Sequence, residues 1–265
     1  MMFDWGKQRL HCTDEGTGPP ILFLHGLGGN ASNWLHQRRH FSRTHRVIAL
    51  DLPGHGRSTG VDVSFREYRD AIEATLDHCE IDQVSIIGLS KGARAGLSFT
   101  AHRPERVHKL VIVNAFLHLT PEDRRSRLEL YELLLRPGGL HVWGDRLLRQ
   151  MGVREHTAIW RGFTASLSSI TPTHLHSVFR ELVDIDQRPE LQNLRKPILL
   201  IRGEKDAFIP PYCVEEMSAI CSTSEVLHLS DSGHLPYLDD PVRFNKAIES
   251  FLLGEARTPS AISAG

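Results

Sequence analysis

The stretch Val84–Ala93, VSIIGLSKGA, decides the fold. It places Ser90 between Gly88 and Gly92, directly after an apolar run and directly before a helical pattern. A serine in this setting lies on a sharp turn from a strand into a helix, and glycines on either side let the two elements approach closely because they lack a β-carbon. The stretch alone leaves two interpretations open: Ser90 is a nucleophile, or it belongs to an ordinary strand-to-helix loop.

Other short apolar runs, bounded by Gly, Pro or Asp, lie on both sides of this stretch. They lack strict alternation, which is typical of strands that helices cover on both faces of a parallel sheet. Amphipathic segments lie between them, and in 64–79, SFREYRDAIEATLDHC, apolar side chains recur at spacings of three and four. We therefore expect an α/β fold with a mostly parallel sheet flanked by helices. The runs are ILFLHG from Ile21, VIALD from Val47, LVIVN from Leu110, PILLIRG from Pro197 and EVLHL from Glu225.

The alternation of strands and helices stops after Asn114, where about eighty residues rich in Leu, Arg and His contain helical patterns without a good strand. One of these helices begins with Thr120 as its N-cap and a proline in its first turn. A strand-to-strand crossover needs far fewer residues, so we expect an inserted helical cap. The predicted domains are a core of residues 1–115 and 191–253, a helical cap of residues 116–190 and a flexible tail of residues 254–265.

Composition and charge exclude several classes of protein. Hydrophobic residues make up 40% of the 265 residues, and 31 Lys and Arg against 32 Asp and Glu give a net charge of -1. We therefore expect no nucleic-acid or membrane partner. The first residues form no apolar stretch of signal-peptide length, and no run approaches the ~18 apolar residues of a membrane span. A cytoplasmic protein with reduced cysteines is expected, because the four cysteines form no C-x-x-C pair or metal-ligand cluster.

A glycine-rich loop after the first of these runs has competing interpretations. LHGLGGNA places Gly26, Gly28 and Ala31 in a G-x-G-x-x-A spacing, and Asp51 ends the next run 25 residues after Gly26. This is the pattern of a dinucleotide-binding loop, in which an acidic residue binds the ribose. A plain turn explains the glycines equally well. A third interpretation, an oxyanion-binding loop, depends on the residues downstream.

A serine hydroxyl needs a base, and the base needs an orienting carboxylate. Sixteen histidines make a single one uninformative, but His234 lies in the loop DSGHLPYLDDP after the last predicted strand. Asp206 lies in the loop RGEKDAFIPP after the preceding strand. Both loops leave a parallel sheet at the edge that carries Ser90, so the three side chains are expected to converge. Asp231 is the rival acid, but it lies three residues from His234 and would have to bend back on its own loop.

With these three residues in the order Ser, acid, His, the sequence resembles the capped serine hydrolase and esterase branch of the α/β-hydrolase fold superfamily. The resemblance covers nearly the whole chain and implies a sheet of the eight-stranded type. It also implies that the helical cap roofs the substrate pocket. The motifs that carry it are LHGLGG at 24–29, DLPGHGRS at 51–58, GLSKG at 88–92, GEKDAFIP at 203–210 and SGH at 232–234.

The same resemblance assigns the oxyanion hole to the backbone N–H groups of Leu27 and Lys91. Gly28 and Gly29 then keep the first loop tight, and Gly26 and Gly28 are expected to contact the substrate. His25 is expected to brace this loop rather than act as a second base. His55 is expected to support the PGHGRS turn beside the site.

The resemblance implies a hydrolase of a carboxylic ester, lactone or thioester with a small, largely apolar substrate and no metal or cofactor. Trp143 and Trp160 of the cap are expected to contact this substrate, although packing explains aromatic residues at helical spacing equally well. Carbon–carbon hydrolysis of ring-fission products is the first alternative, but Leu89 stands where those enzymes usually carry Asn. A non-catalytic ligand-binding protein is the second. Two interpretations of Arg124, Arg125 and Arg127 stay open. They bind a carboxylate of the substrate, or they form a solvated face of a helix.

Lys91 raises a separate question. Its ammonium stands at a predicted helix start, where the helix dipole disfavours a cation by roughly 0.3–1 kcal/mol. One interpretation offsets this cost with a nearby protein carboxylate or with a side chain that reaches water. The other directs the ammonium into the pocket, toward an anionic group of the substrate. Neither length nor composition predicts the oligomeric state.

Overall fold

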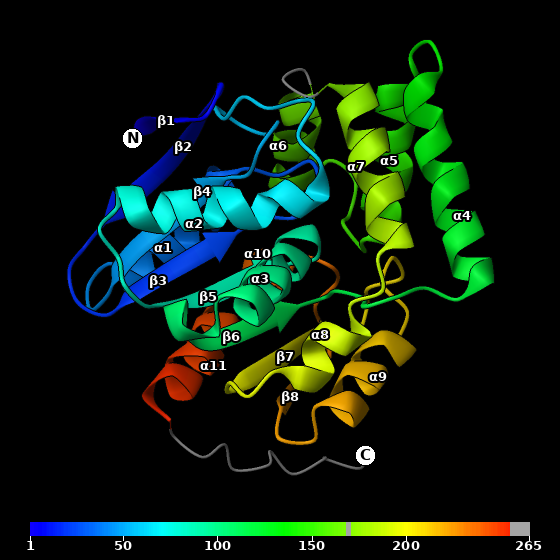
Figure 1. Cartoon of the computed structure of the whole chain (residues 1–265). Coiled ribbons are helices and arrows are strands. Elements are labelled where there is room, and N and C mark those ends of the chain that lie inside the picture. The colour runs from blue at the N-terminus through cyan, green and yellow to red at the C-terminus, as the bar shows by residue number, and fades with distance from the viewer. Residues whose placement is uncertain (168–170, 255–265) are drawn as a thin grey trace.

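An eight-stranded sheet runs through the molecule in the order β1-β2-β4-β3-β5-β6-β7-β8 (Figure 1). The computed structural model describes residues 1–167 and 171–254. All neighbouring strands from β4 to β8 pair in parallel, whereas β2 pairs antiparallel with β1 and with β4. The predicted mostly parallel sheet is confirmed. The strands are β1 Met2–Trp5, β2 Gln8–Glu15, β3 Pro20–Leu24, β4 Arg46–Asp51, β5 Val84–Leu89, β6 Val107–Val113, β7 Ile198–Gly203 and β8 Glu225–Leu229.

The apolar runs of the sequence form β3 to β8, as predicted, but the hairpin β1–β2 was not predicted. β2 is the polar sequence QRLHCTDE, in which the central residues Leu10 to Cys12 are buried and the ends are partly or fully exposed. A hairpin at the edge of the sheet, exposed along part of its length, lacks the continuous apolar run of a strand buried on both faces. The signal that located the other strands is therefore missing here.

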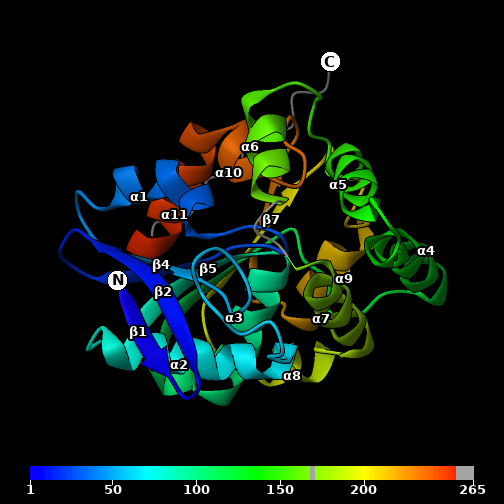
Figure 2. The same cartoon turned by 90° about the horizontal axis from the view of Figure 1, so that it is seen from above.

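Helices cover both faces of the sheet (Figure 2). One face carries α1, α10 and α11, and the other carries α2, α3 and α8, with α9 beside α8. Short 3-10 turns lie at residues 31–34, 65–67, 104–106 and 133–135. The helices are α1 Leu35–Phe41, α2 Tyr68–His78, α3 Lys91–His102, α8 Arg188–Asn193, α9 Tyr212–Ile220, α10 Pro236–Asp239 and α11 Pro241–Leu253.

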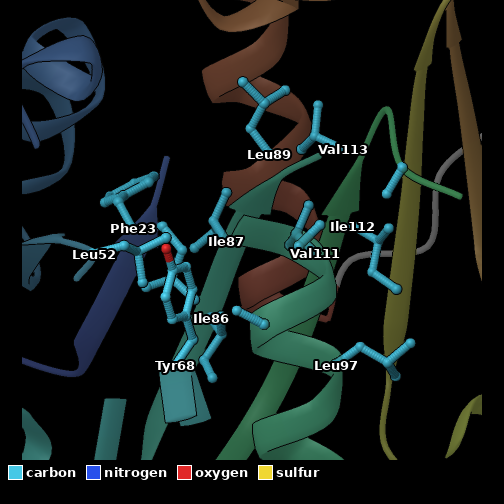
Figure 3. Packing of buried hydrophobic residues seen from close by; sticks show 14 of the residues in the cluster. Phe23, Leu52, Tyr68, Ile86, Ile87, Leu89, Leu97, Val111, Ile112 and Val113 are labelled. Carbon is cyan, nitrogen blue, oxygen red and sulfur yellow. The ribbon is translucent and has the colours of Figure 1, made fainter. Parts of the chain in front are cut away.

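The core lies between the central strands and these helices (Figure 3). All six residues of β5 are buried, as expected for a strand covered on both faces. Ile87 of β5 pairs in register with Phe23 of β3 and Val111 of β6, and Figure 3 shows Tyr68 of α2 beside Ile86. A fully buried aliphatic side chain contributes about 1.5–3 kcal/mol, so this strand is a rigid base for the turn that follows it.

Four helices between β6 and β7 lie together over one end of the sheet, and we call them the inserted helices (Figure 1). They are α4 Pro121–Glu132, α5 Gly139–Gln150, α6 Ala158–Ser166 and α7 Pro172–Asp184. Thr120 caps α4 as predicted, since its side chain accepts the N–H of Asp123 at 3.2 Å. The division into a core and a cap stays a prediction. Residues 255–265 of the predicted tail lie outside the described residues.

None of the described helices is long and apolar enough to cross a membrane.

Gly88 and Gly92 make the predicted close contact between the strands and α3. A β-carbon on Gly88 would lie 2.4 Å from Cα of Ala93, and one on Gly92 would lie 2.3 Å from the carbonyl oxygen of Leu24. Carbon atoms do not approach backbone atoms this closely without displacing them. The two glycines therefore set how near α3 comes to β3 and β5.

We predict that Gly92→Ala lowers the free energy of unfolding by about 1–3 kcal/mol, because the new methyl group forces α3 away from β3. Gly162→Ala is the matched control, since Gly162 lies in α6 with no atom within 4 Å of an added β-carbon. This control should gain up to ~1 kcal/mol from helix propensity. Urea denaturation followed by circular dichroism measures both. Equal stability of the two variants would contradict the contact described here.

Candidate active site

Ser90 lies on the turn between β5 and α3 in a strained backbone conformation. Its dihedral angles are φ 50° and ψ −114°, and such a conformation costs a non-glycine residue about 1–3 kcal/mol. The turn is held from both sides: the N–H of Ser90 donates to the carbonyl of Val113 at 2.8 Å, and its carbonyl accepts the N–H of Arg94 at 3.0 Å. A strained serine between a strand and a helix is the geometry of a nucleophile elbow.

Asp206 and His234 meet at the same edge of the sheet. Oδ2 of Asp206 lies 2.6 Å from Nδ1 of His234, and both side chains are buried. The other carboxylate oxygen accepts the N–H groups of Phe208 at 2.8 Å and Ile209 at 3.0 Å, so the carboxylate is fixed in direction. The bond at Nδ1 leaves Nε2 of His234 for a nucleophile. His234 and Ser90 line one cavity.

Asp231, the rival acid, points away from this site. Its side chain is 86% exposed, and it pairs with Nζ of Lys205 at 3.0 Å. Lys205 holds the pKa of the Asp231 carboxyl below its usual range. The preference for Asp206 over Asp231 therefore agrees with the hydrogen bond that His234 makes.

The loop that carries His234 is held by Asn114, a residue that was not predicted for the site. Nδ2 of Asn114 donates to the carbonyls of Gly233 at 3.1 Å and His234 at 3.0 Å, and Oδ1 accepts the N–H of Gly203 at 3.0 Å. The N–H of Gly233 donates to Asp239 at 2.8 Å. In the sequence, Asn114 is recognisable as a polar residue at the end of the apolar run LVIVN. No sequence spacing, however, connects this position with His234.

The inserted helices are tied to the loops of Asp206 and His234 through the end of α5. The N–H of His234 donates to the carbonyl of Met151 at 2.8 Å, and the N–H of Ala207 donates to the carbonyl of Gln150 at 3.0 Å. These are backbone bonds, so no side-chain pattern predicted them. The orientation of the Asp206 and His234 loops therefore depends on the position of α5.

The arginines of α4 do not line the cavity that Ser90 and His234 share. Arg127 is buried, and its Nε donates to the carbonyl of Phe208 at 2.9 Å, which adds a third tie to the Asp206 loop. Arg124 pairs with Asp184, and Arg125 is exposed. The interpretation of these arginines as a solvated helix face is therefore wrong for Arg127. The other interpretation, in which they bind a carboxylate of the substrate, has no support in the structure.

The backbone N–H groups of Leu27 and Lys91 are free, as an oxyanion hole requires. Both residues line the cavity, and neither N–H finds an acceptor within the described chain. His25 braces the first loop, as predicted: its Nδ1–H donates to the carbonyl of Gly26 at 2.7 Å and its Nε2 accepts the N–H of Leu52 at 3.0 Å. Burial lowers the pKa of His25 well below its usual range, which suits a neutral brace.

The dinucleotide interpretation of this loop is wrong, because Asp51 is not available to a ribose. Its Oδ1 accepts the N–H of Ala31 at 2.6 Å, and its Oδ2 accepts the N–H of Arg57 at 2.9 Å. Oδ2 also lies 2.8 Å from Nδ1 of His11. The buried carboxylate therefore shapes the protein's own loops.

The comparison with protein families agrees with this geometry. A family model described as "Alpha/beta hydrolase family" matches residues 21–247. The chain belongs to the alpha/beta hydrolase family.

Relatives in the family show what this chain is similar to. It is 27% identical over 260 residues to "3-oxoadipate enol-lactonase 2" of Acinetobacter baylyi, covering 88% of each chain. Two solved structures share its fold at TM-scores of 0.84. An enol-lactonase from Burkholderia xenovorans is 21% identical, with 96% of this chain and 100% of that chain covered. A thermophilic esterase from Thermogutta terrifontis is 24% identical, with 94% of this chain and 95% of that chain covered.

The cavity of this family member lies between Ser90 and the inserted helices. The space between its lining atoms amounts to about 620 Å³, its open mouth included. Its walls are mostly apolar and aromatic. They include Leu27, Leu89, Phe116, Tyr131, Phe163, Phe179 and Phe208.

Trp143 and Trp160 do not line the cavity, contrary to expectation. Trp143 is wholly buried and packs edge-on against Tyr131, with ring centroids 5.4 Å apart. Trp160 is buried beneath the guanidinium of Arg149. Both are packing residues of the inserted helices, the interpretation that helical spacing also allowed.

Gly26 lines the cavity as expected, but Gly28 does not, and its place is taken by Gly29. Gly28 has a φ of +79°, and a β-carbon on it would lie 3.4 Å from the ring of Phe163. A positive φ favours glycine at this position. Gly28 therefore shapes the turn beneath α6 rather than contacting a substrate.

The side chain of Lys91 follows neither of its two expected courses. It is 1% exposed, and its Nζ lies 3.1 Å from Nε2 of His55 and 4.9 Å from the ring centroid of Tyr68. No carboxylate pairs with it in the described part of the chain, and it does not reach water. His55 and Tyr68 do not line the cavity, so the contacts of Nζ direct it away from a substrate.

His55 supports the turn, as predicted, and accepts the hydrogen bond of the lysine. Its Nδ1–H donates to the carbonyl of Pro53 at 2.9 Å, which leaves Nε2 as the acceptor for Nζ of Lys91. The rings of His25 and His174 lie 5.2 Å and 5.6 Å from that of His55. Burial lowers the pKa of Lys91 well below its usual range, because no charge compensates the lost hydration. Lys91, His55 and their histidine neighbours therefore form a buried network in which the described residues place no carboxylate.

We predict that Lys91→Met raises the free energy of unfolding at pH 7, because it removes a buried amine whose folded-state pKa is lowered by lost hydration. Because the folded-state pKa is lowered, the unfolded state binds more protons between that pKa and 10.5. The wild-type protein therefore gains stability as the pH rises, and its difference from Lys91→Met narrows toward pH 10. Urea denaturation between pH 7 and 10 measures this difference. The exposed Lys246→Met is the control, and a pH-independent difference for Lys91→Met would contradict a lowered pKa of Lys91.

Proposed function

We propose that the protein is a serine hydrolase that cleaves a carboxylic ester, lactone or thioester of a small, largely apolar substrate. The observation that carries the proposal is the 2.6 Å bond between His234 and Asp206 beside a cavity that His234 shares with the strained Ser90. The three residues are the catalytic triad of this proposal. It requires no metal and no organic cofactor.

In the proposed reaction Oγ of Ser90 attacks the substrate carbonyl while Nε2 of His234 takes its proton. Asp206 holds the imidazole in the correct tautomer and stabilises the imidazolium. The oxyanion binds to the N–H groups of Leu27 and Lys91, and losing one such donor costs roughly 3 kcal/mol. His234 then protonates the leaving alcohol or thiol, and water releases the acyl group from Ser90 by the reverse sequence.

The substrate class is supported by the cavity and by the relatives. Aromatic and aliphatic side chains form most of its walls, which suits an apolar acyl or alcohol part. The similar proteins carry the names enol-lactonase and esterase, both of which describe attack on an ester carbonyl. In this proposal the inserted helices serve as the cap that shapes substrate choice. We place the protein in the cytoplasm, where its four free, buried cysteines suit a reducing environment.

A panel of p-nitrophenyl esters of rising chain length, with a thioester and a lactone, tests the reaction class. We expect hydrolysis of short and medium chains. Ser90→Ala should lower kcat/KM about 10⁴-fold or more, because the remaining donors cannot replace the nucleophile. Cleavage of none of these substrates, or equal rates for wild type and Ser90→Ala, would contradict the proposal. Cleavage of a ring-fission diketone alone would replace it with carbon–carbon hydrolysis.

A fluorophosphonate probe separates an enzyme from a ligand-binding protein of the same fold. An activated serine attacks phosphorus without any substrate-specific contact, so the wild-type protein should be labelled at Ser90. Ser98→Ala, which removes a hydroxyl of α3 outside the site, should keep the labelling. Intact protein that is not labelled at Ser90, as judged by peptide mass spectrometry, would favour the non-catalytic alternative.

A further inference from the structure

Two tyrosine hydroxyls in the cavity have no hydrogen-bond partner in the described chain. Tyr131 of α4 and Tyr237 of α10 both line the cavity, and both residues are about 98% buried or more. Some polar side-chain atoms of the described residues have neither accessible surface nor a hydrogen-bond partner. The hydroxyls of Tyr131 and Tyr237 are not among these atoms. Both hydroxyls therefore keep some accessible surface, and both residues line the cavity.

Tyr131 is the better defined of the two, because its ring is fixed on both sides. It stacks on Phe179 with ring centroids 3.5 Å apart and an interplanar angle of 4°. Trp143 packs against it edge-on at 5.4 Å. The ring cannot turn without breaking these contacts, so the hydroxyl keeps one direction. A buried hydroxyl with no partner costs free energy that a ligand acceptor would recover.

We propose that the Tyr131 hydroxyl donates a hydrogen bond to a second, uncharged oxygen of the substrate, such as a ketone or ether oxygen. Tyr131 is then the residue that selects a small ester or lactone with an additional oxygen over its hydrocarbon analogue. This inference rests on the proposed function. The scissile carbonyl is not the acceptor, because the N–H groups of Leu27 and Lys91 are free to bind it.

The proposed acceptor is uncharged because the described walls of the cavity offer no free positive charge to a carboxylate. Lys91 and His234 are the basic residues among the described walls of the cavity. Nζ of Lys91 is directed to His55, and His234 is bound to Asp206. A carboxylate here would lose its hydration without a countercharge, whereas a neutral oxygen needs a single donor.

The test compares chains of equal length in which oxygen replaces one methylene group. The substrates are the p-nitrophenyl esters of pentanoate, ethoxyacetate and 3-methoxypropanoate, with the hemiglutarate ester as the anionic member. In a second series, oxygen replaces one methylene group in the alcohol part of acetate esters. A pH indicator follows the acid that their hydrolysis releases. The proteins are wild type, Tyr131→Phe, which keeps the stacked ring, and Tyr212→Phe. Tyr212 is the control because its hydroxyl bonds to Asp123 at 2.9 Å outside the cavity.

The readout is the ratio of kcat/KM for each ether ester to that for its hydrocarbon analogue, divided by the wild-type ratio. We expect Tyr131→Phe to lower this ratio roughly tenfold or more for at least one position of the oxygen, and Tyr212→Phe to leave it unchanged. The anionic ester should be the poorest substrate of wild type. A ratio that Tyr131→Phe leaves unchanged in both series, or a preference of wild type for the anionic ester, would overturn the inference.

A binding measurement keeps this inference apart from the proposed function. Ser90→Ala and the double variant Ser90→Ala, Tyr131→Phe are titrated with methyl pentanoate, methyl ethoxyacetate and methyl 3-methoxypropanoate by saturation-transfer NMR. We expect tighter binding of one ether ester, lost in the double variant. If wild type cleaves no ester but this preference is seen, the proposed function fails and the Tyr131 site stands. If esters are cleaved but no preference is seen in binding or in rate, the Tyr131 site fails alone.

Discussion

The position of Ser90 depends on a contact that glycine alone permits. Gly88 and Gly92 bring α3 against β3 and β5 at distances that a methyl group would block, and the chain between them has to take a positive φ at Ser90. The strain is held by the buried strands β5 and β6, whose backbone anchors the turn through Val113. The free N–H of Lys91 is a consequence of the same geometry, because it opens the helix that this turn begins.

Asp206 and His234 depend on a different support, since their loops lie between the sheet and the inserted helices. Asn114 fixes the His234 loop from the sheet side, and the carbonyls of Gln150 and Met151 receive N–H groups from the other side. Arg127 adds a side-chain tie to the Asp206 loop. Three residues far apart in the sequence are therefore aligned by two separate sets of bonds, one at the turn and one at the loops.

Much of this arrangement was predictable because it depends on local patterns. Buried parallel strands appear as apolar runs in the sequence. Asp206 and His234 follow the ends of β7 and β8, so a parallel sheet places them at the same edge as Ser90. Contacts between residues that lie far apart in the sequence were not predictable. Trp143 packs instead of lining the cavity, and Lys91 bonds to a histidine because the described residues place no carboxylate beside it. Asn114 acts on a loop 120 residues away, which spacing cannot reveal.

The backbone bonds at the end of α5 have a consequence for changing the substrate range of this protein. An exchange of the inserted helices with those of a relative is an obvious route to a new specificity. Such a chimaera has to retain the last turn of α5 together with Met151, because their carbonyls hold the loops of Asp206 and His234. A graft that ends one residue early would remodel the pocket and displace these loops in the same step.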